Sequence, residues 1–257
     1  MTYSLFDLTD KIAIVTGAGR GLGAAMAAGL ASAGAQVVCA ARTESEIQET
    51  ADRIADHGGK AVPLCFDATD RDSCHNLIAE TCERFGRIDV MLVNHGISAA
   101  IAAEDITTDD WRKTMDINLT GCFNCAQAAG QKMIEQGQGG SIILVSSNAS
   151  IVAFRGLTSY AVSKAGVDQL CRQLALEWGK HNIRVNTINP GYMTHAMRGA
   201  EQRYHTPDLD DKIAKTTPLP RRGEPEELVG PVVFLASDSS SFVTGHIMPV
   251  DGGYTIL

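Results

Sequence analysis

The sequence contains no apolar run long enough to cross a membrane and no excess of positive charge. None of its hydrophobic stretches approaches the roughly 20 residues that a bilayer-spanning helix needs. The 22 Lys and Arg residues against 30 Asp and Glu residues give a net charge of −8, whereas nucleic acids and anionic membranes select basic surfaces. Residues 1–10 also lack the basic start of a secretory signal. We therefore expect a protein that binds neither nucleic acid nor membrane.

Cysteines are few, odd in number and scattered. The seven cysteines indicate reduced thiols and a cytoplasmic location. Cys122 and Cys125 have a spacing seen in redox and zinc sites, but both fall within one predicted helix without a second pair, so we expect no metal site. Apolar residues make up 44% and charged residues 20% of the chain, which excludes a disordered protein. A length of 257 residues without an internal linker predicts a single domain over residues 1–257.

Short β-rich runs alternate with helical periods along the chain. Strands are predicted over residues 12–16, 36–40, 61–66, 90–93, 141–146, 183–188 and 247–250, and helices over 21–33, 43–57, 70–85, 108–136, 157–180 and 225–236. This alternation predicts an α/β fold, a single Rossmann-type doubly wound parallel sheet of about seven strands with helices on both faces. Ligands bind outside the carboxyl ends of such strands, so we expect the aperiodic segment 193–220 to cover the site as a lid.

A glycine-rich turn joins the first predicted strand to the first predicted helix. Residues 16–23 read Thr-Gly-Ala-Gly-Arg-Gly-Leu-Gly. The glycines permit a tight turn, and the following helix offers free N–H groups and its positive dipole end, which together suit a pyrophosphate. Any strand-to-helix turn favours glycine, so the motif gains its meaning from its place at the start of a βαβ series.

Tyr160 and Lys164 lie four residues apart in a predicted helix and so share one face. A phenol with an ordinary pKa of about 10 is a poor base at neutral pH. An ammonium about 4 Å away stabilises the phenolate by about 4 kcal/mol at an effective dielectric near 20. The two side chains can therefore work as an acid–base unit, although the spacing alone favours an ordinary amphipathic helix pair.

The ordered motifs together resemble the short-chain dehydrogenase/reductase family over nearly the whole chain. The turn has the form T-G-x-x-x-G-x-G, and it is followed by Asp67, Asn94-His95-Gly96, Asn118, Ser147, Tyr160 with Lys164, Pro190-Gly191 and Asp251-Gly252-Gly253. This resemblance implies an oxidoreductase that interconverts a secondary alcohol and a ketone by hydride transfer with a nicotinamide cofactor. It also implies a homotetramer or homodimer built through the helices at 108–136 and 157–180.

The resemblance assigns the catalytic roles to four residues. Tyr160 is the acid–base residue, and Lys164 binds the nicotinamide ribose and tunes Tyr160. Ser147 holds the substrate oxygen; the 13-residue separation from Tyr160 selects it over its neighbour Ser146. Asn118 holds a water on the proton path to the lysine.

The resemblance also implies a set of cofactor contacts along the chain. They are Gly17, Arg20, Gly21, Leu22, Gly23, Arg42, Asp67, Ala68, Asn94, His95, Gly96, Tyr160, Lys164, Pro190, Gly191 and Thr194. The end of the second strand reads Ala41-Arg42, where a carboxylate would favour NAD. Guanidinium groups at Arg20 and Arg42 suit a 2′-phosphate, so NADP(H) is expected over NAD(H), unless Arg42 simply lies in a solvated turn.

The sequence departs from the family pattern at three positions near the expected site. His95 replaces a small residue and Ser150 stands where glycine is frequent. His195 occupies the position of a threonine that contacts the cofactor, and the neighbouring Thr194 is the expected substitute.

The substrate does not follow from the fold. The sequence resembles gluconate and deoxygluconate dehydrogenases and also 3-oxoacyl-carrier-protein reductases. An acidic carrier protein requires a basic surface, so the net charge of −8 favours a small polar substrate such as a sugar acid or polyol. A non-catalytic cofactor-binding regulator would tolerate loss of Ser147, Tyr160 or Lys164; all three are present, which favours an enzyme.

Overall fold

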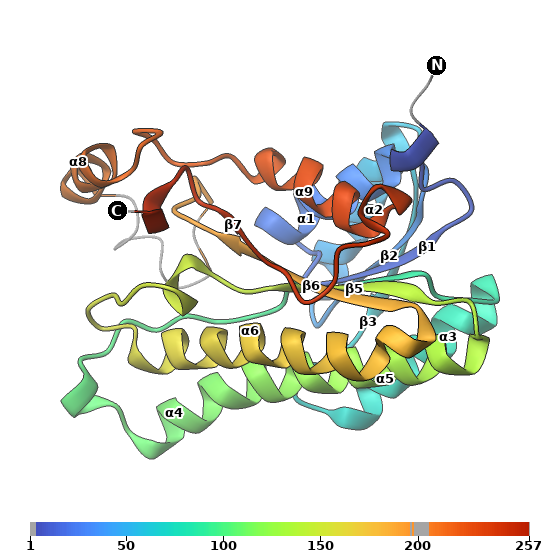
Figure 1. Cartoon of the computed structure of the whole chain (residues 1–257), viewed down its shortest axis with the longest axis horizontal. Helices are drawn as coiled ribbons and strands as arrows, with labels where there is room; N and C mark the ends of the chain where they lie inside the picture. The colour runs from blue at the N-terminus through green and yellow to red at the C-terminus, as the bar shows by residue number, and fades with distance from the viewer. Residues whose placement is uncertain (1–3, 196, 198–205, 257) are drawn as a thin grey trace.

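The computed structural model describes residues 4–195, 197 and 206–256 (Figure 1). Seven parallel strands form one sheet in the order β3-β2-β1-β4-β5-β6-β7. The strands are β1 (Ile12–Thr16), β2 (Gln36–Ala41), β3 (Lys60–Cys65), β4 (Val90–Val93), β5 (Gly140–Val145), β6 (Ile183–Pro190) and β7 (Ile247–Val250). The predicted doubly wound parallel sheet is confirmed.

Helices cover both faces of the sheet (Figure 1). One face carries α1 (Gly21–Ser32), α2 (Glu44–Asp56) and α9 (Val229–Ala236), and the other carries α3 (Arg71–Phe85), α5 (Gly121–Gln136) and α6 (Thr158–Trp178). Every residue of β1 and β4 is buried, which explains why these strands read as unbroken apolar runs. Among the described residues, no helix is both long and apolar enough to cross a membrane.

The strand order places a ligand site between β1 and β4. The chain proceeds outward from β1 to β2 and β3, then returns to add β4 on the other side of β1. Ligands of open parallel sheets bind at such a reversal, outside the carboxyl ends of the strands. The glycine turn follows β1 and the Asn94 segment follows β4, so both motifs meet there.

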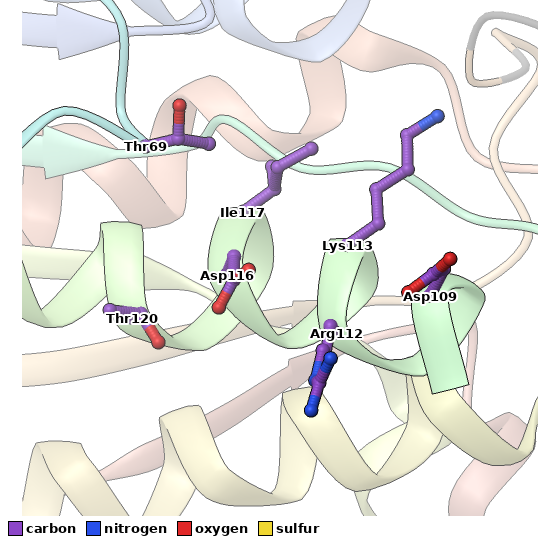
Figure 2. Close-up of a pocket in the computed structure, with 7 residues that line it drawn as sticks. All are labelled: Thr69, Asp109, Arg112, Lys113, Asp116, Ile117 and Thr120. Atoms are coloured by element: carbon purple, nitrogen blue, oxygen red, sulfur yellow. The ribbon is translucent and has the colours of Figure 1, made fainter.

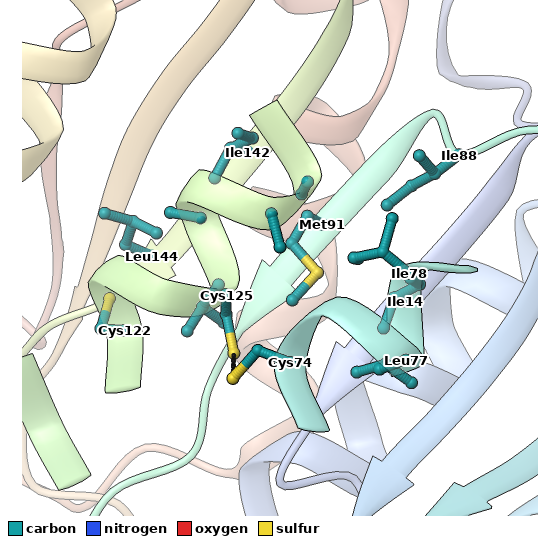
Figure 3. Packing of buried hydrophobic residues seen from close by; sticks show 14 of the residues in the cluster. Ile14, Cys74, Leu77, Ile78, Ile88, Met91, Cys122, Cys125, Ile142 and Leu144 are labelled. Atoms are coloured by element: carbon teal, nitrogen blue, oxygen red, sulfur yellow. Dashed lines mark hydrogen bonds between the residues drawn. The ribbon is translucent and has the colours of Figure 1, made fainter. Parts of the chain in front are cut away.

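The two faces of the sheet have separate apolar cores. The core under α3 and α5 contains Ile14, Met91 and Ile142, all fully buried (Figure 3). Cys74 and Cys125 meet in this core with their sulfur atoms 3.6 Å apart. Burial raises the pKa of the Cys122 thiol to about 12, so this cysteine is an apolar packing residue here.

The predicted long helix over 108–136 is interrupted in the structure. It consists of α4 (Thr108–Met115), a π-helical turn (Asp116–Thr120) and α5. The side chain of Asn118 points out of this turn and binds the backbone of Ile97. Such single π turns widen a helix locally and are frequent at functional sites. Apolar periodicity does not reveal them, because the helical pattern continues on either side.

Several predicted boundaries also need correction. Thr43 precedes α2 and has the spacing of a capping box with Glu46, but its side chain makes no cap hydrogen bond. Strand β6 runs two residues beyond the predicted end because it pairs with β7 as far as Pro190. The last predicted helix divides into a 3₁₀ turn (Pro225–Leu228) and α9.

Only part of the predicted lid over 193–220 falls within the described residues. Residues 196 and 198–205 lie outside them. The described part contains a helix, α8 (Pro207–Thr216), which begins after Thr206, whose hydroxyl accepts from the backbone N–H of Leu209. The acidic residues of its first turn suit a helix N-terminus.

Candidate active site

The glycine turn after β1 leaves no room for side chains. Gly17 and Gly21 have φ values of +64° and +56°, which other residues adopt only with strain. A Cβ atom at Gly23 would lie 2.1 Å from the carbonyl oxygen of Gly17. Asn94 donates its Nδ2 to the carbonyl oxygens of Thr16 and Gly17, both at 3.2 Å. The end of β4 therefore holds the turn in its shape.

The segment after β6 lies against this turn. A Cβ atom at Gly21 would lie 2.3 Å from Cδ2 of His195, and Nη1 of Arg20 lies 3.4 Å from Nε2 of His195. The hydroxyl of Thr194 instead donates to Oε2 of Glu224 at 2.6 Å. The structure thus brings His195, rather than Thr194, to the glycine turn.

The loops after β2 and β3 meet beside the turn. Ala41 ends β2, and Arg42 is exposed next to it. The backbone N–H of Thr69 lowers the pKa of Asp67, and the charge of Arg42 adds to this effect. Both residues therefore border the same edge of the sheet, and no carboxylate stands at the end of β2.

His95 is held as a neutral residue after β4. Its Nδ1 lies 2.9 Å from the hydroxyl of Thr16, and its ring packs edge-on against Phe66 with centroids 5.8 Å apart. Nε2 is buried without a hydrogen-bond partner among the described residues. Burial lowers the pKa of His95 to about 3, and the positive charge of Lys164 acts in the same direction.

Lys164 is buried beneath the site with its ammonium group aimed at polar partners. Its exposure is 4%, and its Nζ donates to the carbonyl oxygen of Val145 at 2.8 Å. Nζ lies 5.8 Å from the ring centroid of Tyr160. Desolvation lowers the pKa of Lys164 to about 8, so the side chain remains mostly charged at neutral pH.

Asn118 reaches the same place from the π turn. It accepts from the backbone N–H of Ile97 at 2.8 Å and donates to the carbonyl oxygen of Ile97 at 2.9 Å and to the hydroxyl of Ser163 at 3.1 Å. A Cβ atom at Gly96 would lie 3.3 Å from Oδ1 of Asn118 and 3.6 Å from Nζ of Lys164. The loop after β4, the π turn and α6 therefore converge.

Ser147 lies just beyond β5 and is 7% exposed. Its hydroxyl accepts from the backbone N–H of Ala149 at 3.1 Å and lies 3.3 Å from Oδ1 of Asn148. The hydroxyl of Ser146 donates instead to the carbonyl oxygen of Lys164 at 3.0 Å. Ser146 thus anchors α6 to the sheet, which leaves Ser147 as the candidate serine of the site.

Comparison with known proteins gives matches along almost the whole chain. A family model described as Enoyl-(Acyl carrier protein) reductase matches residues 17–255. The chain is 39% identical over 261 residues to 2-dehydro-3-deoxy-D-gluconate 5-dehydrogenase of Escherichia coli, covering 99% of each chain. The chain belongs to the short-chain dehydrogenase/reductase family.

Other members show the breadth of that family. L-rhamnose 1-dehydrogenase (NAD(P)(+)) of Azotobacter vinelandii is 39% identical over 252 residues, covering 96% of this chain and 97% of the relative. The crystal structure of gluconate 5-dehydrogenase from Burkholderia cenocepacia, in complex with NADP and tartrate, is 35% identical with a TM-score of 0.94, covering 99% and 98%. As a short-chain dehydrogenase/reductase, the protein is an oxidoreductase that acts on alcohol groups with NAD(P), and the prediction of an enzyme is confirmed.

In this short-chain dehydrogenase/reductase, two buried polar residues near Ser147 are not among the site residues predicted from the sequence. Asn189, near the end of β6, and Asp168, on α6, are 0% and 5% exposed. The sequence feature that could have indicated Asn189 is its place at the end of an apolar strand, next to Pro190-Gly191. Gly191 permits the close approach of the residue that follows β7, since a Cβ atom there would lie 2.7 Å from Cα of Asp251.

Two open cavities flank the site. The first, of about 420 Å³, lies between Thr69 and the helix formed by α4 and the π turn. Lys113 and Ile117 extend from that helix on the side that faces the cavity (Figure 2). The second, of about 480 Å³, is bordered by Tyr192 and Asp251. Tyr192 belongs to an aromatic cluster with Phe154 and Tyr254, with ring centroids 5.5 to 6.0 Å apart.

Proposed function

We propose that this protein interconverts a secondary alcohol and a ketone on a small polyhydroxylated substrate, a sugar acid or a polyol, with NADP(H). The observation that carries this proposal is the convergence of Lys164, Asn118 and Gly96, with the ammonium of Lys164 5.8 Å from the ring centroid of Tyr160 and Ser147 at the same edge of the sheet. A buried ammonium beside a phenol serves proton transfer, and it has no evident use in a binding module.

The residues of the site fit a dinucleotide. The glycine turn packs so closely against itself and Asn94 that a Cβ atom at Gly23 would clash, and the adjoining N-terminus of α1 suits a diphosphate. Gly17, Gly21, Leu22 and Gly23 would hold the diphosphate, and Arg20 and Arg42 the 2′-phosphate. Asp67 and Ala68 would hold the adenine, and Asn94, His95 and Gly96 the adenosine ribose. Tyr160 and Lys164 would hold the nicotinamide ribose, and Pro190 and Gly191 the nicotinamide, whereas the hydroxyl of Thr194, expected to make the same contact, is bonded to Glu224.

When bound, the cofactor supplies or accepts a hydride at its nicotinamide ring. Tyr160 then gives a proton to the carbonyl oxygen of the substrate, or accepts the hydroxyl proton in the oxidative direction. The ammonium of Lys164, about 6 Å from the ring, stabilises the phenolate by roughly 3 kcal/mol at an effective dielectric of 20. Ser147 orients the substrate oxygen. Asn118 lies between the backbone of Ile97 and Ser163, where it can hold a water that returns protons toward Lys164.

The relatives support a sugar-type substrate. Proteins named for deoxygluconate, gluconate and L-rhamnose match this chain over nearly its whole length. The second candidate is a 3-oxoacyl-carrier-protein reductase, which the description of the matching family model favours. The net charge of −8 opposes docking of an acidic carrier protein.

A substrate panel and one variant test this proposal. A sugar acid, a neutral sugar, a polyol and an acetoacetyl thioester are assayed by absorbance of the reduced cofactor. We expect turnover of a sugar acid or polyol, and highest efficiency with the thioester would favour the second candidate. Tyr160→Phe should lower the turnover rate at least 100-fold, because it deletes the proton donor, while cofactor affinity changes little. Retained turnover would refute the role of Tyr160.

The preference for NADP(H) rests on Arg20, Arg42 and the absence of a carboxylate at the end of β2. A charge-assisted hydrogen bond to a phosphate contributes about 1.5–3 kcal/mol, so Arg42→Ala should lower kcat/KM for NADP about 10- to 100-fold and leave NAD unaffected. Arg84→Ala, an exposed arginine on α3 paired with Glu80, is the matched control. An equal loss with both cofactors would contradict the assignment.

We further propose that the enzyme works in the cytoplasm. All seven cysteines are free thiols, which is typical of reducing compartments. Fractionation of cells that express the natural protein checks this proposal, and recovery outside the cytoplasm would contradict it.

A further inference from the structure

A buried asparagine links β6 to the loop that carries Ser147. Asn189 is 0% exposed and occupies the penultimate position of β6. Its Nδ2 lies 3.1 Å from the carbonyl oxygen of Ser147 and 2.8 Å from the hydroxyl of Ser150. The side chain therefore spans from one strand to the loop that follows its neighbour in the sheet.

The orientation of this amide is determined from its other end. The hydroxyl of Thr187 donates to Oδ1 of Asn189 at 2.8 Å. The carbonyl of Ser147 can only accept, so Nδ2 must face it. A rotated amide would set Oδ1 against this carbonyl, with two acceptors in contact. Thr187 is itself fully buried, which keeps water from replacing it.

A carboxylate on α6 contacts the same amide. Oδ1 and Oδ2 of Asp168 lie 3.2 and 3.1 Å from Nδ2 of Asn189, and Asp168 is 5% exposed. A carboxylate this deeply buried requires hydrogen-bond donors to compensate for lost hydration. Asp168 follows Lys164 by one helical turn, so this contact ties the helix of Lys164 to the loop of Ser147.

We propose that Asn189 and Asp168 are positioning residues that set the backbone of Ser147 and thereby the direction of its hydroxyl. This proposal rests on the role of Ser147 in the proposed function. The carbonyl of Ser147 also accepts from the backbone N–H and the hydroxyl of Ser150, at 3.0 and 2.7 Å. Both of those donors belong to the loop itself, whereas Asn189 joins the loop to the sheet.

The chain offers a matched control for Asn189. Asn186 lies on the same strand, is also 0% exposed, and bonds the backbone of Val243 and His246 at 2.9 and 3.1 Å. Its contacts run toward β7 and away from Ser147. Asn186→Ala and Asn189→Ala therefore remove the same group at the same burial, and both variants should unfold at lower denaturant concentration than the parent.

The two variants should differ in catalysis. Misplacement of a substrate-orienting group by about 1 Å costs up to about 100-fold in rate, so we expect Asn189→Ala to lower kcat about 10- to 100-fold. Its affinity for the cofactor, measured by fluorescence titration, should stay within about twofold. Asn186→Ala should keep kcat near the parent value at a temperature where it is fully folded. An equal kcat for both variants would overturn the proposal.

A double-mutant cycle separates positioning of Ser147 from a general structural role. If Asn189 and Asp168 act through Ser147, then Asn189→Ala or Asp168→Ala should have no further effect on kcat in a Ser147→Ala background. Multiplication of the separate losses would overturn the proposal. Full activity of Ser147→Ala would instead refute the proposed function itself. If Ser147→Ala is too slow to measure, Thr187→Val provides the test instead. This variant removes the hydroxyl that holds Oδ1 of Asn189, so we expect kcat to fall several-fold while cofactor affinity stays unchanged. An unchanged kcat would overturn the proposal.

Discussion

Gly23 shows how strongly one residue constrains the cofactor turn. A Cβ atom there would meet the backbone of Gly17 at 2.1 Å, and a backbone cannot move aside as a flexible side chain can. At Gly21 the obstacle is the ring of His195, which can rotate away. The two glycines therefore differ in what a methyl group would cost.

We expect Gly23→Ala to reduce cofactor affinity at least 100-fold, because the diphosphate cradle must open to admit the methyl group. Gly230→Ala, at a helical glycine with nothing within 4 Å of the added atom, serves as the control. Calorimetric titration of the cofactor into each variant measures the effect. Affinity of Gly23→Ala within about threefold of the parent would show that the turn is not the cofactor cradle.

The buried ammonium of Lys164 makes stability depend on pH. Burial lowers the pKa of Lys164 to about 8 in the native state, whereas lysine in an unfolded chain titrates near 10.4. Between these values the unfolded chain holds a proton that the native protein has lost, so the free energy of unfolding rises as the pH increases. Below pH 7 both states are protonated and this dependence vanishes.

Lys164→Met should abolish that pH dependence. From pH 7 to pH 9 we expect the parent protein to gain about 1 kcal/mol relative to the variant. Urea unfolding of both proteins at the two pH values measures the difference. Parallel changes in parent and variant would mean that Lys164 titrates as an exposed lysine does.

At the residue scale, the resemblance to a known family singles out Tyr160, Lys164 and Asn118, whereas no motif singles out the residues that support them. Asn189 and Asp168 are 21 residues apart in sequence and meet only because α6 packs against β6. No local pattern encodes that contact, and the same holds for His195 against the glycine turn.

At the element scale, the sequence pattern located the strands of the described chain. Burial on both faces gives central strands such as β1 and β4 an apolar run, whereas the edge strands β3 and β7 are only partly buried. The pattern failed where a contact with a distant part of the chain overrides the local repeat. The π turn around Asn118 arises from hydrogen bonds to Ile97, which lies 21 residues away. Strand β6 likewise extends to Pro190 only because β7 pairs with it.

Close packing between α5 and α6 gives a prediction at this scale. A Cβ atom at Gly130 would lie 2.5 Å from the indole ring of Trp178, so the methyl group of Gly130→Ala overpacks the contact. We expect a loss of about 1–3 kcal/mol in the free energy of unfolding. Gly230→Ala, a helical glycine in open space, should instead gain roughly 0.5–1 kcal/mol. Denaturant unfolding compares them; a gain for both would mean that the two helices part easily.

At the scale of the whole molecule, the outer face of α6 exposes apolar side chains to solvent, which is unfavourable. Leu176 is 80% exposed and Val162 is 45% exposed. They lie 14 residues apart, which is close to four helical turns and places them on one face. On α4, Trp111 is 37% exposed. Apolar side chains grouped in this way typically mark a protein–protein interface.

We therefore propose a homodimer or homotetramer in which this face is covered by a second copy. A charge within this face cannot be buried without a partner, so Leu176→Glu should shift the protein to smaller species in light scattering at micromolar concentration. Leu5→Glu, at a residue 50% exposed near the N-terminus, tests whether any added charge has this effect. If the parent is monomeric, or if Leu176→Glu leaves the mass unchanged, the face of α6 does not hold the assembly together.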